Sequence, residues 1–299
     1  MKNLINLNSW NKEELFALLE NAKKLKAQLN AGEEHHLLKG KNIGMVFDKS
    51  SLRTRVSFEV GINQLGAHAI VLGDSAGKLG EREPISDFGR VASRYVNGLI
   101  VRTYEEAKIE ELASYATVPV INALSDDSHP CQSLADVMTL IEHWGSLEEK
   151  TLTYMGDSNN VTRSLVRIAV LLGLNMHVIS PENYHFDEKE KSYWENKGIK
   201  FFTDPKEGVA GVDSIYTDVW TSMGQEKEKQ QRLKDFQGYC IDMEIVGLAS
   251  KDVKILHCLP AHRGEEISHD VIESDHSIVF DQAENRLHIQ KAIMVACFN

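Results

Sequence analysis

The stretch that decides the fold is residues 42–60, which read NIGMVFDKSSLRTRVSFEV. Its first six residues form a short apolar run with the composition of a buried strand. Phe58, Ile62 and Leu65 then follow at helical spacing (i, i+4, i+7), which predicts a helix that begins near Thr54. A strand therefore turns into a helix within a few residues.

The turn between this strand and this helix carries two hydroxyls and two arginines, at Ser51, Thr54, Arg53 and Arg55. The free N–H groups of a helix N-terminus and the helix dipole favour an anion there. Arginine adds forked donors that match phosphate oxygens. The alternative is a surface turn whose arginines are solvated, because a short motif is only a hypothesis.

Length and charge narrow the class of protein. A chain of 299 residues suggests two domains, and 42% hydrophobic with 26% charged residues is an ordinary globular composition. The net charge of −11 and the pI near 5.6 argue against nucleic acid or an anionic membrane surface as the main partner. An acidic surface around a local arginine-rich pocket fits a small anionic substrate better.

The cysteines and the N-terminus bear on the compartment. The four cysteines are scattered without a C-x-x-C pair, which suits a reducing compartment and indicates neither a zinc site nor a disulfide framework. The N-terminus lacks the apolar segment of a signal peptide, and no run approaches the ~18 apolar residues that span a bilayer. We therefore expect a cytoplasmic protein without a membrane partner.

Apolar runs alternate with helical patterns along the chain, which predicts βαβ units and parallel sheets. The expected strands are residues 42–47, 66–72, 98–102, 119–123, 151–155, 176–180, 200–203, 214–217 and 254–257. The expected helices are 11–29, one from near residue 54, one containing 87–95, one from Pro130, and 161–173, 187–198, 225–236 and 285–298.

The pattern resets near residues 144–146, which predicts a domain boundary. The expected fold class is α/β, with two domains that are each a parallel sheet flanked by helices. The domains would be residues 1–144 and 145–284, and a C-terminal helix in 285–299 would pack back on the first domain.

Polar residues collect where these strands end. Ligands of open α/β sheets bind outside the carboxyl ends of the strands. The groups at those ends are Ser51–Arg55, Arg102 and residues 129–132, 157–160, 218–224 and 257–260. Six such groups on one edge suggest a binding site.

Three residues of this set could bind a phosphate or a carbonyl oxygen. His129 and Gln132 lie three apart at a helix start, so they share a face and could both reach one ligand. The alternative is that His129 caps the helix while Gln132 is solvated. Arg102 ends an apolar strand, where it could bind phosphate or form a structural ion pair.

The later groups could hold an amino acid. Asn160 could bind a carboxylate or cap the helix that follows it, and Asp218 could hold an ammonium or cap the turn at 219–222. Residues 222–224, Ser-Met-Gly, form a small-residue turn that could close over a ligand. Cys258 could be a small buried hydrophobic residue or a thiol with tuned reactivity.

Four of these motifs together resemble the ornithine carbamoyltransferases of the aspartate/ornithine carbamoyltransferase family. They are Ser-Leu-Arg-Thr-Arg at 51–55, His-Pro-Cys-Gln at 129–132, Asp-Val-Trp-Thr-Ser-Met-Gly at 218–224 and His-Cys-Leu-Pro at 257–260. The resemblance runs along essentially the whole chain in the family's order and spacing. The first two motifs are shared by carbamoyltransferases in general, whereas the last two narrow the amine acceptor to ornithine.

The resemblance implies two binding sites and a catalytic set. Carbamoyl phosphate would be bound by Ser51, Leu52 (through its backbone), Arg53, Thr54, Lys78, Arg102, His129, Gln132, Cys258, Leu259 and Arg286. Ornithine would be bound by Asn160, Asp218, Ser222 and the backbone of Met223. The catalytic residues would be Arg53, Arg102, His129, Asp218 and Cys258.

Two positions depart from the family pattern. Residue 52 is leucine where threonine is common, which is harmless if only its N–H is used. In the loop 75–83, where the family often has a glutamine contributed by the neighbouring subunit, the alignment places Lys78. A lysine there would still suit an anionic ligand.

The implied reaction is a direct acyl transfer. The neutral δ-amine of ornithine attacks the carbonyl carbon of carbamoyl phosphate, and phosphate leaves to give citrulline, a step of arginine biosynthesis that can run in reverse in catabolism. The resemblance implies that the reaction needs neither a metal nor an organic cofactor. It also implies that the chain assembles as a homotrimer or a multiple of trimers. Two alternatives are the carbamoylation of another amine, such as putrescine or aspartate, and a non-catalytic sensor of a phosphate ligand.

Overall fold

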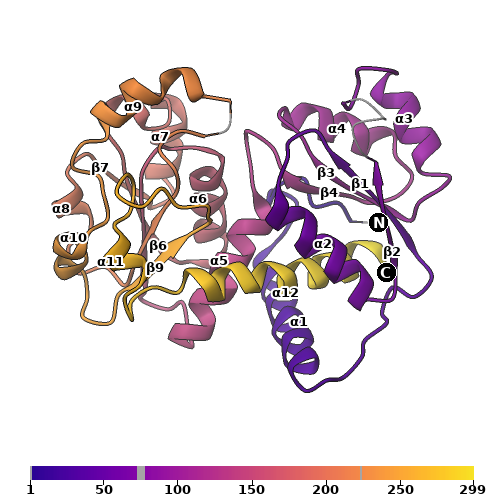
Figure 1. Cartoon of the computed structure of the whole chain (residues 1–299), viewed down its shortest axis with the longest axis horizontal. Helices are drawn as coiled ribbons and strands as arrows, with labels where there is room; N and C mark the ends of the chain where they lie inside the picture. The colour runs from indigo at the N-terminus through magenta and orange to yellow at the C-terminus, as the bar shows by residue number, and fades with distance from the viewer. Residues whose placement is uncertain (1, 73–77, 223) are drawn as a thin grey trace. The chain divides into compact units, whose positions relative to one another are not determined.

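The computed structural model describes residues 2–72, 78–222 and 224–299. The chain forms two compact units (Figure 1). Unit 1 comprises Met1–Met138 and Glu284–Asn299, and unit 2 comprises Thr139–Ala283. The boundaries fall inside two helices, α5 (Pro130–Trp144) and α12 (Val279–Phe298). Pro130 begins α5, as its fixed φ favours at a first helical position.

Unit 1 is built on a parallel sheet of four strands in the order β2-β1-β3-β4. The strands are β1 (Asn42–Phe47), β2 (His68–Leu72), β3 (Gly98–Arg102) and β4 (Val120–Leu124). The helices are α1 (Lys12–Asn30), α2 (Leu52–Gln64), α3 (Ile85–Ala92) and α4 (Glu106–Tyr115). The strand order reverses between β1 and β3, which places their carboxyl ends at the usual ligand position of an open α/β sheet.

Unit 2 is built on a parallel sheet of five strands in the order β7-β6-β5-β8-β9. The strands are β5 (Thr151–Met155), β6 (Asn175–Ile179), β7 (Lys200–Phe202), β8 (Ser214–Thr217) and β9 (Lys254–His257). The helices are α6 (Asn160–Leu172), η2 (Glu182–Tyr184), α7 (Glu188–Glu195), α8 (Pro205–Gly208), η3 (Glu226–Glu228), α9 (Lys229–Asp235), α10 (Met243–Leu248) and α11 (His269–Ile272). Here the order reverses between β5 and β8.

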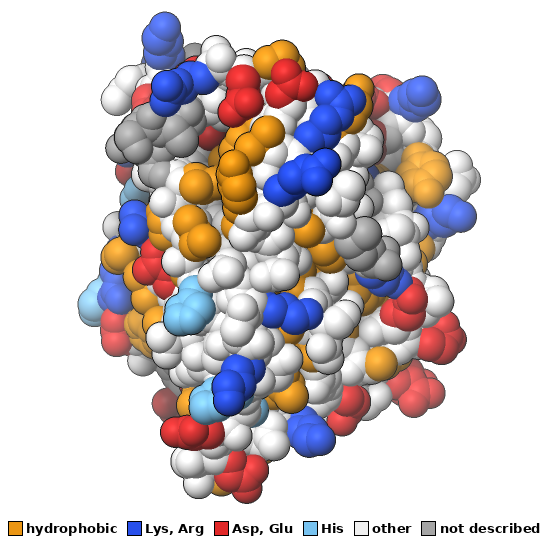
Figure 2. Space-filling view, turned by 90° about the vertical axis from the view of Figure 1, so that its right-hand side faces the viewer, with side chains coloured by type: hydrophobic (Ala, Val, Ile, Leu, Met, Phe, Trp, Pro, Cys, Tyr) orange, Lys and Arg blue, Asp and Glu red, His pale blue; other side chains and the backbone are white. Residues whose placement is uncertain are grey.

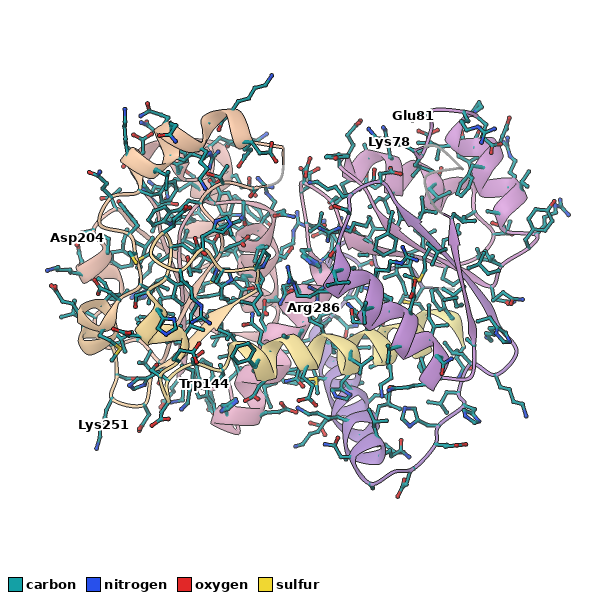
Figure 3. The ribbon with its side chains drawn as sticks, viewed as in Figure 1. Lys78, Glu81, Trp144, Asp204, Lys251 and Arg286 are labelled. Carbon is teal, nitrogen blue, oxygen red and sulfur yellow. The ribbon has the colours of Figure 1, made fainter. Side chains whose placement is uncertain are left out.

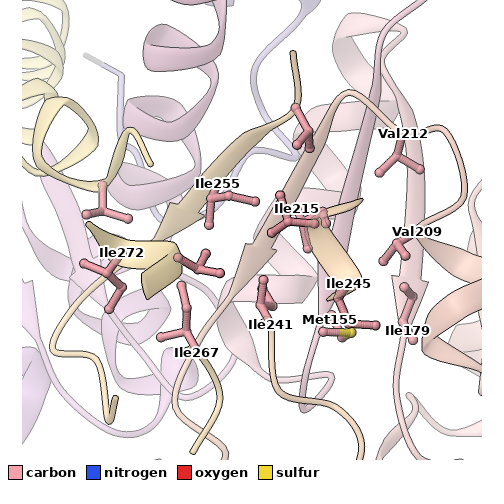
Figure 4. Packing of buried hydrophobic residues seen from close by; sticks show 14 residues of the cluster. Met155, Ile179, Val209, Val212, Ile215, Ile241, Ile245, Ile255, Ile267 and Ile272 are labelled. Carbon is pink, nitrogen blue, oxygen red and sulfur yellow. The ribbon is translucent and has the colours of Figure 1, made fainter. Parts of the chain in front are cut away.

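A core of isoleucine and valine fixes one face of the second sheet (Figure 4). Ile215 and Ile255 on neighbouring strands are fully buried, and they pack in one cluster with Ile241 and Ile267 from the connecting segments. Burial of each such side chain contributes about 1.5–3 kcal/mol. This packing holds β8 and β9, whose carboxyl ends carry polar groups, in fixed register.

The C-terminal helix α12 packs on unit 1, as the sequence predicts. A Cβ at Gly61 of α2 would lie 3.1 Å from Met294 and 3.2 Å from Lys291, and a Cβ at Gly98 would overlap the ring of Phe298. Glycine is therefore needed where Phe298 of α12 packs on β3, whereas at Gly61 a side chain would press on Met294 and Lys291. Lys291 is fully buried, with its Nζ 3.2 Å from Nε2 of His35.

The predicted fold class is confirmed, while several element bounds differ. Helix α2 begins at Leu52, two residues before Thr54, because Ser51 caps it. Helix α12 begins at Val279, six residues before the predicted start. The predicted helix 225–236 is divided into η3 and α9. No helix among the described residues is long and apolar enough to cross a membrane.

Candidate functional site

The hydroxyl of Thr54 is the meeting point of the polar groups in unit 1. Ser51, directly after β1, caps α2: its Oγ accepts from the Thr54 N–H at 3.3 Å and donates to Thr54 Oγ1 at 3.0 Å. Arg286 Nη2 donates to Thr54 Oγ1 at 2.8 Å, and Arg102 Nη1 approaches it at 3.4 Å. Two guanidinium groups from distant parts of the chain therefore converge on the N-terminus of one helix.

These arginines are held out of water. Arg102 is 7% exposed and Arg286 is 4% exposed, while Thr54 is fully buried. Arg286 extends from α12 (Figure 3). Two cations placed together at low exposure repel each other and lose hydration, so the arrangement favours an anion that would neutralise them. The helix N-terminus adds to the same preference.

His129 belongs to the same group. It directly precedes α5 and is 4% exposed. Burial, followed by the charges of Arg286 and Arg102, lowers the pKa of His129 well below its usual range. The imidazole is therefore neutral at physiological pH, so one ring nitrogen carries a proton that it can donate and the other can only accept. We call Ser51, Thr54, Arg102, His129 and Arg286 the Thr54 cluster.

Gln132 lies on the first turn of α5 and is 1% exposed. Its Nε2 donates to Asp136 Oδ1 at 2.8 Å, one turn further along the helix. Gln132 is therefore not a solvated side chain, and the interpretation that leaves it in water is wrong. Its Oε1 is buried without a hydrogen-bond partner among the described residues.

Three further predicted residues of unit 1 lie outside these hydrogen bonds. Arg53 is half-buried on the first turn of α2, and the side chain of Leu52 is 77% exposed. Lys78 is exposed: its backbone N–H donates to Glu81 at 3.2 Å, and its Nζ lies 3.9 Å from Glu81 (Figure 3). Within its own unit, Lys78 is thus engaged with Glu81.

Sequence reasoning missed the residue that fixes the strand ends around this cluster. Asp48, directly after β1, accepts from Thr103 Oγ1 at 2.6 Å and from the Leu79 N–H at 3.2 Å. It thereby joins the ends of β1 and β3 and anchors the segment that follows Lys78. The sequence could have indicated this role, because Asp48 is an aspartate directly after a predicted buried strand.

In unit 2, the carboxylate of Asp218 takes the corresponding position. It follows β8 and is 9% exposed. Asp218 accepts from Asn159 Nδ2 at 2.9 Å, from Cys258 Sγ at 2.9 Å and from the Val219 N–H at 2.8 Å. The bond to Val219 is the local cap that one interpretation expects, but the other two bonds join the ends of three strands. We call Asn159, Asp218 and Cys258 the Asp218 cluster.

Asn159 is the second residue that sequence reasoning missed. Its Oδ1 caps α6 by accepting from the N–H groups of Val161 and Thr162, at 2.9 and 3.2 Å. The predicted residue Asn160 is the first residue of α6 and half-buried, so the capping role belongs to its neighbour. The pair of adjacent asparagines left the cap and the ligand-binding residue indistinguishable in the sequence.

The turn after β8 holds the other predicted ornithine-binding residues. Ser222 is half-buried, and its backbone N–H donates to Gln225 Oε1 at 3.0 Å. Met223 lies outside the described residues. Arg232 of α9 supports this turn: it donates to the Trp220 carbonyl at 2.9 Å and to Asp157 at 2.7 Å. Burial raises the pKa of the Asp157 carboxyl, and the Arg232 charge opposes that rise.

The segment after β9 carries Cys258 and Leu259. The Cys258 thiol is half-buried and donates to Asp218, so it acts here as a hydrogen-bond donor. Leu259 has a φ of 57°, a left-handed conformation that is uncommon outside glycine. Its N–H donates to Nδ1 of His257 at 2.8 Å, and Nε2 of His257 lies 3.0 Å from Oε1 of the buried Glu266.

Two sets of side chains in the described part of the chain have ligand atoms close enough for a metal ion. They are Asp218, His257 and Cys258, and His262, Glu265 and Glu266, with atoms within 4.8 Å of one another. Both ring nitrogens of His257 are in hydrogen bonds, and Glu265 pairs with Lys229 at 3.2 Å. A metal ion would have to displace these partners.

Two family models match the chain. The model of the aspartate/ornithine carbamoyltransferase carbamoyl-P binding domain matches residues 2–142. The model of the aspartate/ornithine carbamoyltransferase Asp/Orn binding domain matches residues 148–297.

Individual proteins are similar over nearly the whole chain. The ornithine carbamoyltransferase of Archaeoglobus fulgidus is 50% identical over 297 residues, which cover 99% of this chain and 97% of that protein. That of Syntrophotalea carbinolica is 48% identical over 295 residues, 98% of each chain. The solved structure of ornithine carbamoyltransferase from Pyrococcus furiosus superposes with a TM-score of 0.96 at 45% identity, covering 99% of this chain and 97% of that one.

Proposed function

Because the chain belongs to the aspartate/ornithine carbamoyltransferase family, we propose that it transfers the carbamoyl group of carbamoyl phosphate to the δ-amine of L-ornithine, giving L-citrulline and phosphate. Residues 1–144 would bind carbamoyl phosphate and residues 145–284 would bind ornithine, with the helix in 285–299 completing the first site. The two clusters of polar groups differ in charge as these two ligands require.

The convergence of two buried guanidinium groups on Thr54 is the observation that carries the proposal. Arg102 and Arg286 together offer the positive charge and the forked donors that a phosphate dianion matches. Ser51, Thr54 and the backbone N–H of Leu52 supply neutral donors at the start of α2. Arg53, half-buried on the same turn, would approach the phosphate from the solvent side.

A neutral His129 suits the carbonyl end of the same substrate. An imidazole that keeps a single proton can donate it as a hydrogen bond to the carbonyl oxygen and stabilise the negative charge that develops there. Gln132 has a buried carbonyl oxygen that would accept from the carbamoyl NH2 group. Both residues would thus orient the carbamoyl group for attack.

The Asp218 cluster suits the other substrate. The Asp218 carboxylate would attract an ammonium group, and Asn160, Ser222 and the Met223 backbone would hold the α-amino and α-carboxylate groups of ornithine. Cys258 and Leu259 would face the side-chain amine and the carbamoyl group. Asp157, held by Arg232, adds a further carboxylate near the ends of the same strands.

The proposed reaction balances with the two substrates alone. The lone pair of the neutral δ-amine forms a C–N bond, the C–O bond to phosphate breaks with its electron pair, and the amine loses one proton. Arg53, Arg102 and His129 would stabilise the oxyanion and the leaving phosphate, while Asp218 and Cys258 would position the amine and relay its proton. Activity should therefore rise with pH toward the pKa of the amine, and a flat pH profile would contradict this mechanism.

We propose in addition that the chain assembles as a homotrimer or a multiple of trimers. Leu52, Val56 and Val60 repeat at i, i+4, i+8 on α2 and are 77%, 46% and 39% exposed. Hydrophobic side chains also appear in groups between charged ones on the face drawn in Figure 2. An apolar stripe on a helix beside the phosphate-binding turn fits a subunit contact, and Lys78 would reach a neighbouring subunit's ligand.

Citrulline formation from carbamoyl phosphate and ornithine tests the reaction, with putrescine and aspartate assayed in parallel. Turnover with ornithine alone supports the proposal. Turnover only with another amine would overturn the acceptor assignment and keep the phosphate site. Binding of carbamoyl phosphate without turnover of any amine would instead indicate a sensor.

Light scattering tests the assembly. Val56→Glu should reduce the trimer to smaller species, whereas Tyr193→Glu, at a side chain of unit 2 that is 55% exposed, should not. A wild-type monomer, or a trimer unchanged by Val56→Glu, would contradict the proposed contact.

A further inference from the structure

We infer that Glu266 and His257 are positioning residues that set the conformation of Cys258 and Leu259 through the tautomer of the His257 ring. This inference rests on the proposed function, which places these two residues against the reacting groups. Its basis is a continuous chain of hydrogen bonds from a buried carboxylate to a left-handed backbone position.

The direction of one hydrogen bond determines the protonation of the ring. The Leu259 N–H donates to His257 Nδ1 at 2.8 Å. A backbone amide nitrogen has no lone pair to offer, so Nδ1 must be the acceptor and cannot carry a proton. The His257 imidazole is thus neutral with its proton on Nε2, and that proton is donated to Glu266 Oε1 at 3.0 Å.

Glu266 is suited to impose this tautomer. A carboxylate can only accept, so a ring nitrogen facing it has to be the donor. Glu266 and the ring of His257 are both fully buried, where an unsatisfied carboxylate would be costly. Glu266 Oε1 also accepts from the His262 N–H at 2.5 Å, and its own carbonyl accepts from the Ile241 N–H at 2.9 Å. Its place is therefore fixed by backbone contacts.

At its other end, this series of hydrogen bonds reaches Leu259, whose backbone conformation is strained. Leu259 has a φ of 57°, which is unfavourable for a residue with a Cβ unless its surroundings hold it there. The bond from its N–H to His257 supplies such a restraint. His257 is itself tied down, since its backbone N–H donates to Gln282 Oε1 at 2.9 Å. Cys258, between the two, then points its thiol to Asp218.

Wild-type protein labelled with ¹⁵N in histidine tests the tautomer without reference to activity. We expect the His257 signals, assigned from their loss in a His257→Asn variant, to show a protonated Nε2 and an unprotonated Nδ1 at pH 7. Glu266→Gln supplies a side chain that can also donate, so there we expect a mixture of the two neutral tautomers. A protonated Nδ1 in the wild type, or an unchanged tautomer in Glu266→Gln, would overturn the inference.

Two substitutions at position 257 separate positioning from simple structural support. Asparagine at 257 offers an oxygen near the place of Nδ1, so it retains an acceptor for the Leu259 N–H. Glutamine reaches further and offers an amide to Glu266 instead. If the Leu259 restraint matters, His257→Gln should lower kcat/KM for ornithine by about 100-fold, the cost of a displacement near 1 Å, and His257→Asn should lower it markedly less.

Ligand binding, matched control variants and melting temperatures separate a positioning role of His257 from a loss of folding. Carbamoyl phosphate binding, followed by calorimetry, should weaken less than kcat/KM for ornithine in both variants, because the phosphate end of that ligand would be bound by the Thr54 cluster. His276→Asn and His276→Gln are matched controls, because Nδ1 of His276 contacts the Val253 carbonyl at 3.0 Å, before β9 begins. Equal losses in the two His257 variants, or losses that follow their melting temperatures, would overturn the inference. Absence of ornithine turnover in the wild type would refute the proposed function, and the ¹⁵N measurement would still decide the tautomer.

Discussion

The Thr54 and Asp218 clusters occupy equivalent places in their sheets but gather opposite charges. Each lies where the strand order reverses, at β1/β3 in unit 1 and β5/β8 in unit 2. Thr54 is approached by two arginines, while Asp218 is approached by an amide and a thiol that donate to its carboxylate. The common fold thus sets where polar groups gather, at the ends of the strands, and the residues at those ends set the charge of the ligand that they would favour.

The largest expected effect is at the cationic cluster. Arg286→Ala removes the shorter of the two arginine contacts to Thr54, and we expect kcat/KM for carbamoyl phosphate to fall about 1,000-fold, as for loss of a preorganised donor. The KM for ornithine in the presence of saturating carbamoyl phosphate should change much less. Steady-state kinetics with both substrates varied makes this measurement.

Arg90→Ala is the matched control, because Arg90 is an exposed arginine of the same unit that pairs with Asp87. It should leave both kinetic constants near those of the wild type. An Arg286→Ala enzyme that binds carbamoyl phosphate normally would show that the convergence on Thr54 is structural.

The second prediction addresses the anionic cluster. Asp218→Asn preserves the shape and an acceptor for Cys258 but removes the charge, so we expect kcat/KM for ornithine to fall by about 100-fold. Carbamoyl phosphate binding should be retained. Asp204→Asn, at an exposed helix cap of unit 2, is the control and should have little effect (Figure 3). If Asp218→Asn lowered kcat/KM equally for both substrates, the assignment of one substrate to each cluster would be wrong.

The third prediction concerns the stability of unit 1. Burial lowers the pKa of Lys291 to about 8. The unfolded chain therefore binds more protons than the folded one between pH 8 and about 10.5, so this lysine destabilises the fold fully below pH 8 and less as the pH rises toward 10.5. Lys291→Met should raise the free energy of unfolding at pH 7 by roughly 2 kcal/mol.

Urea unfolding at pH 7 and at pH 10 measures this difference. The gain from Lys291→Met should shrink at the higher pH, because the folded lysine is already neutral at pH 10 while the unfolded lysine is beginning to lose its proton. A gain that is the same at both pH values, or a loss of stability at pH 7, would show that the contact of Lys291 with His35 outweighs the cost of burial.

The smallest expected effect separates the adjacent asparagines. Asn159→Ala removes the cap of α6 and should lower the free energy of unfolding by about 1 kcal/mol. Asn160→Ala, on the first turn, should leave stability nearly unchanged and raise the KM for ornithine. Thermal unfolding and kinetics on the two variants decide between the roles, and a reversal of the two results would exchange them.

Local sequence patterns predicted most of the fold because buried strands have a strong signal. The bounds of β1, β3, β5, β8 and β9 match the apolar runs. Helices α4, α8, α10 and α11 were not predicted. Three of them, α8, α10 and α11, have only four to six residues and no room for a helical period, whereas α4 has ten residues but only two buried apolar positions, Ile109 and Leu112. Their starts are set by caps and by tertiary packing.

The candidate site was less accessible to local reasoning. The contact between Thr54 and Arg286 joins residues 232 apart, so no spacing rule reaches it, and Arg286 was named from the family resemblance alone. Asp48 and Glu266 act through other residues and carry no motif of their own. What sequence patterns provide well is the list of strand ends, and the contacts between those ends require the folded chain.

Leu52 illustrates how a binding site can tolerate change. Its backbone belongs to the first turn of α2, whose N–H groups face the proposed phosphate, while its side chain is 77% exposed. The backbone and the side chain of Leu52 therefore have separate roles, and only the role of the side chain depends on which amino acid stands at this position. In the proposed assembly, natural variation at this position would alter the association of subunits without altering the recognition of the phosphate.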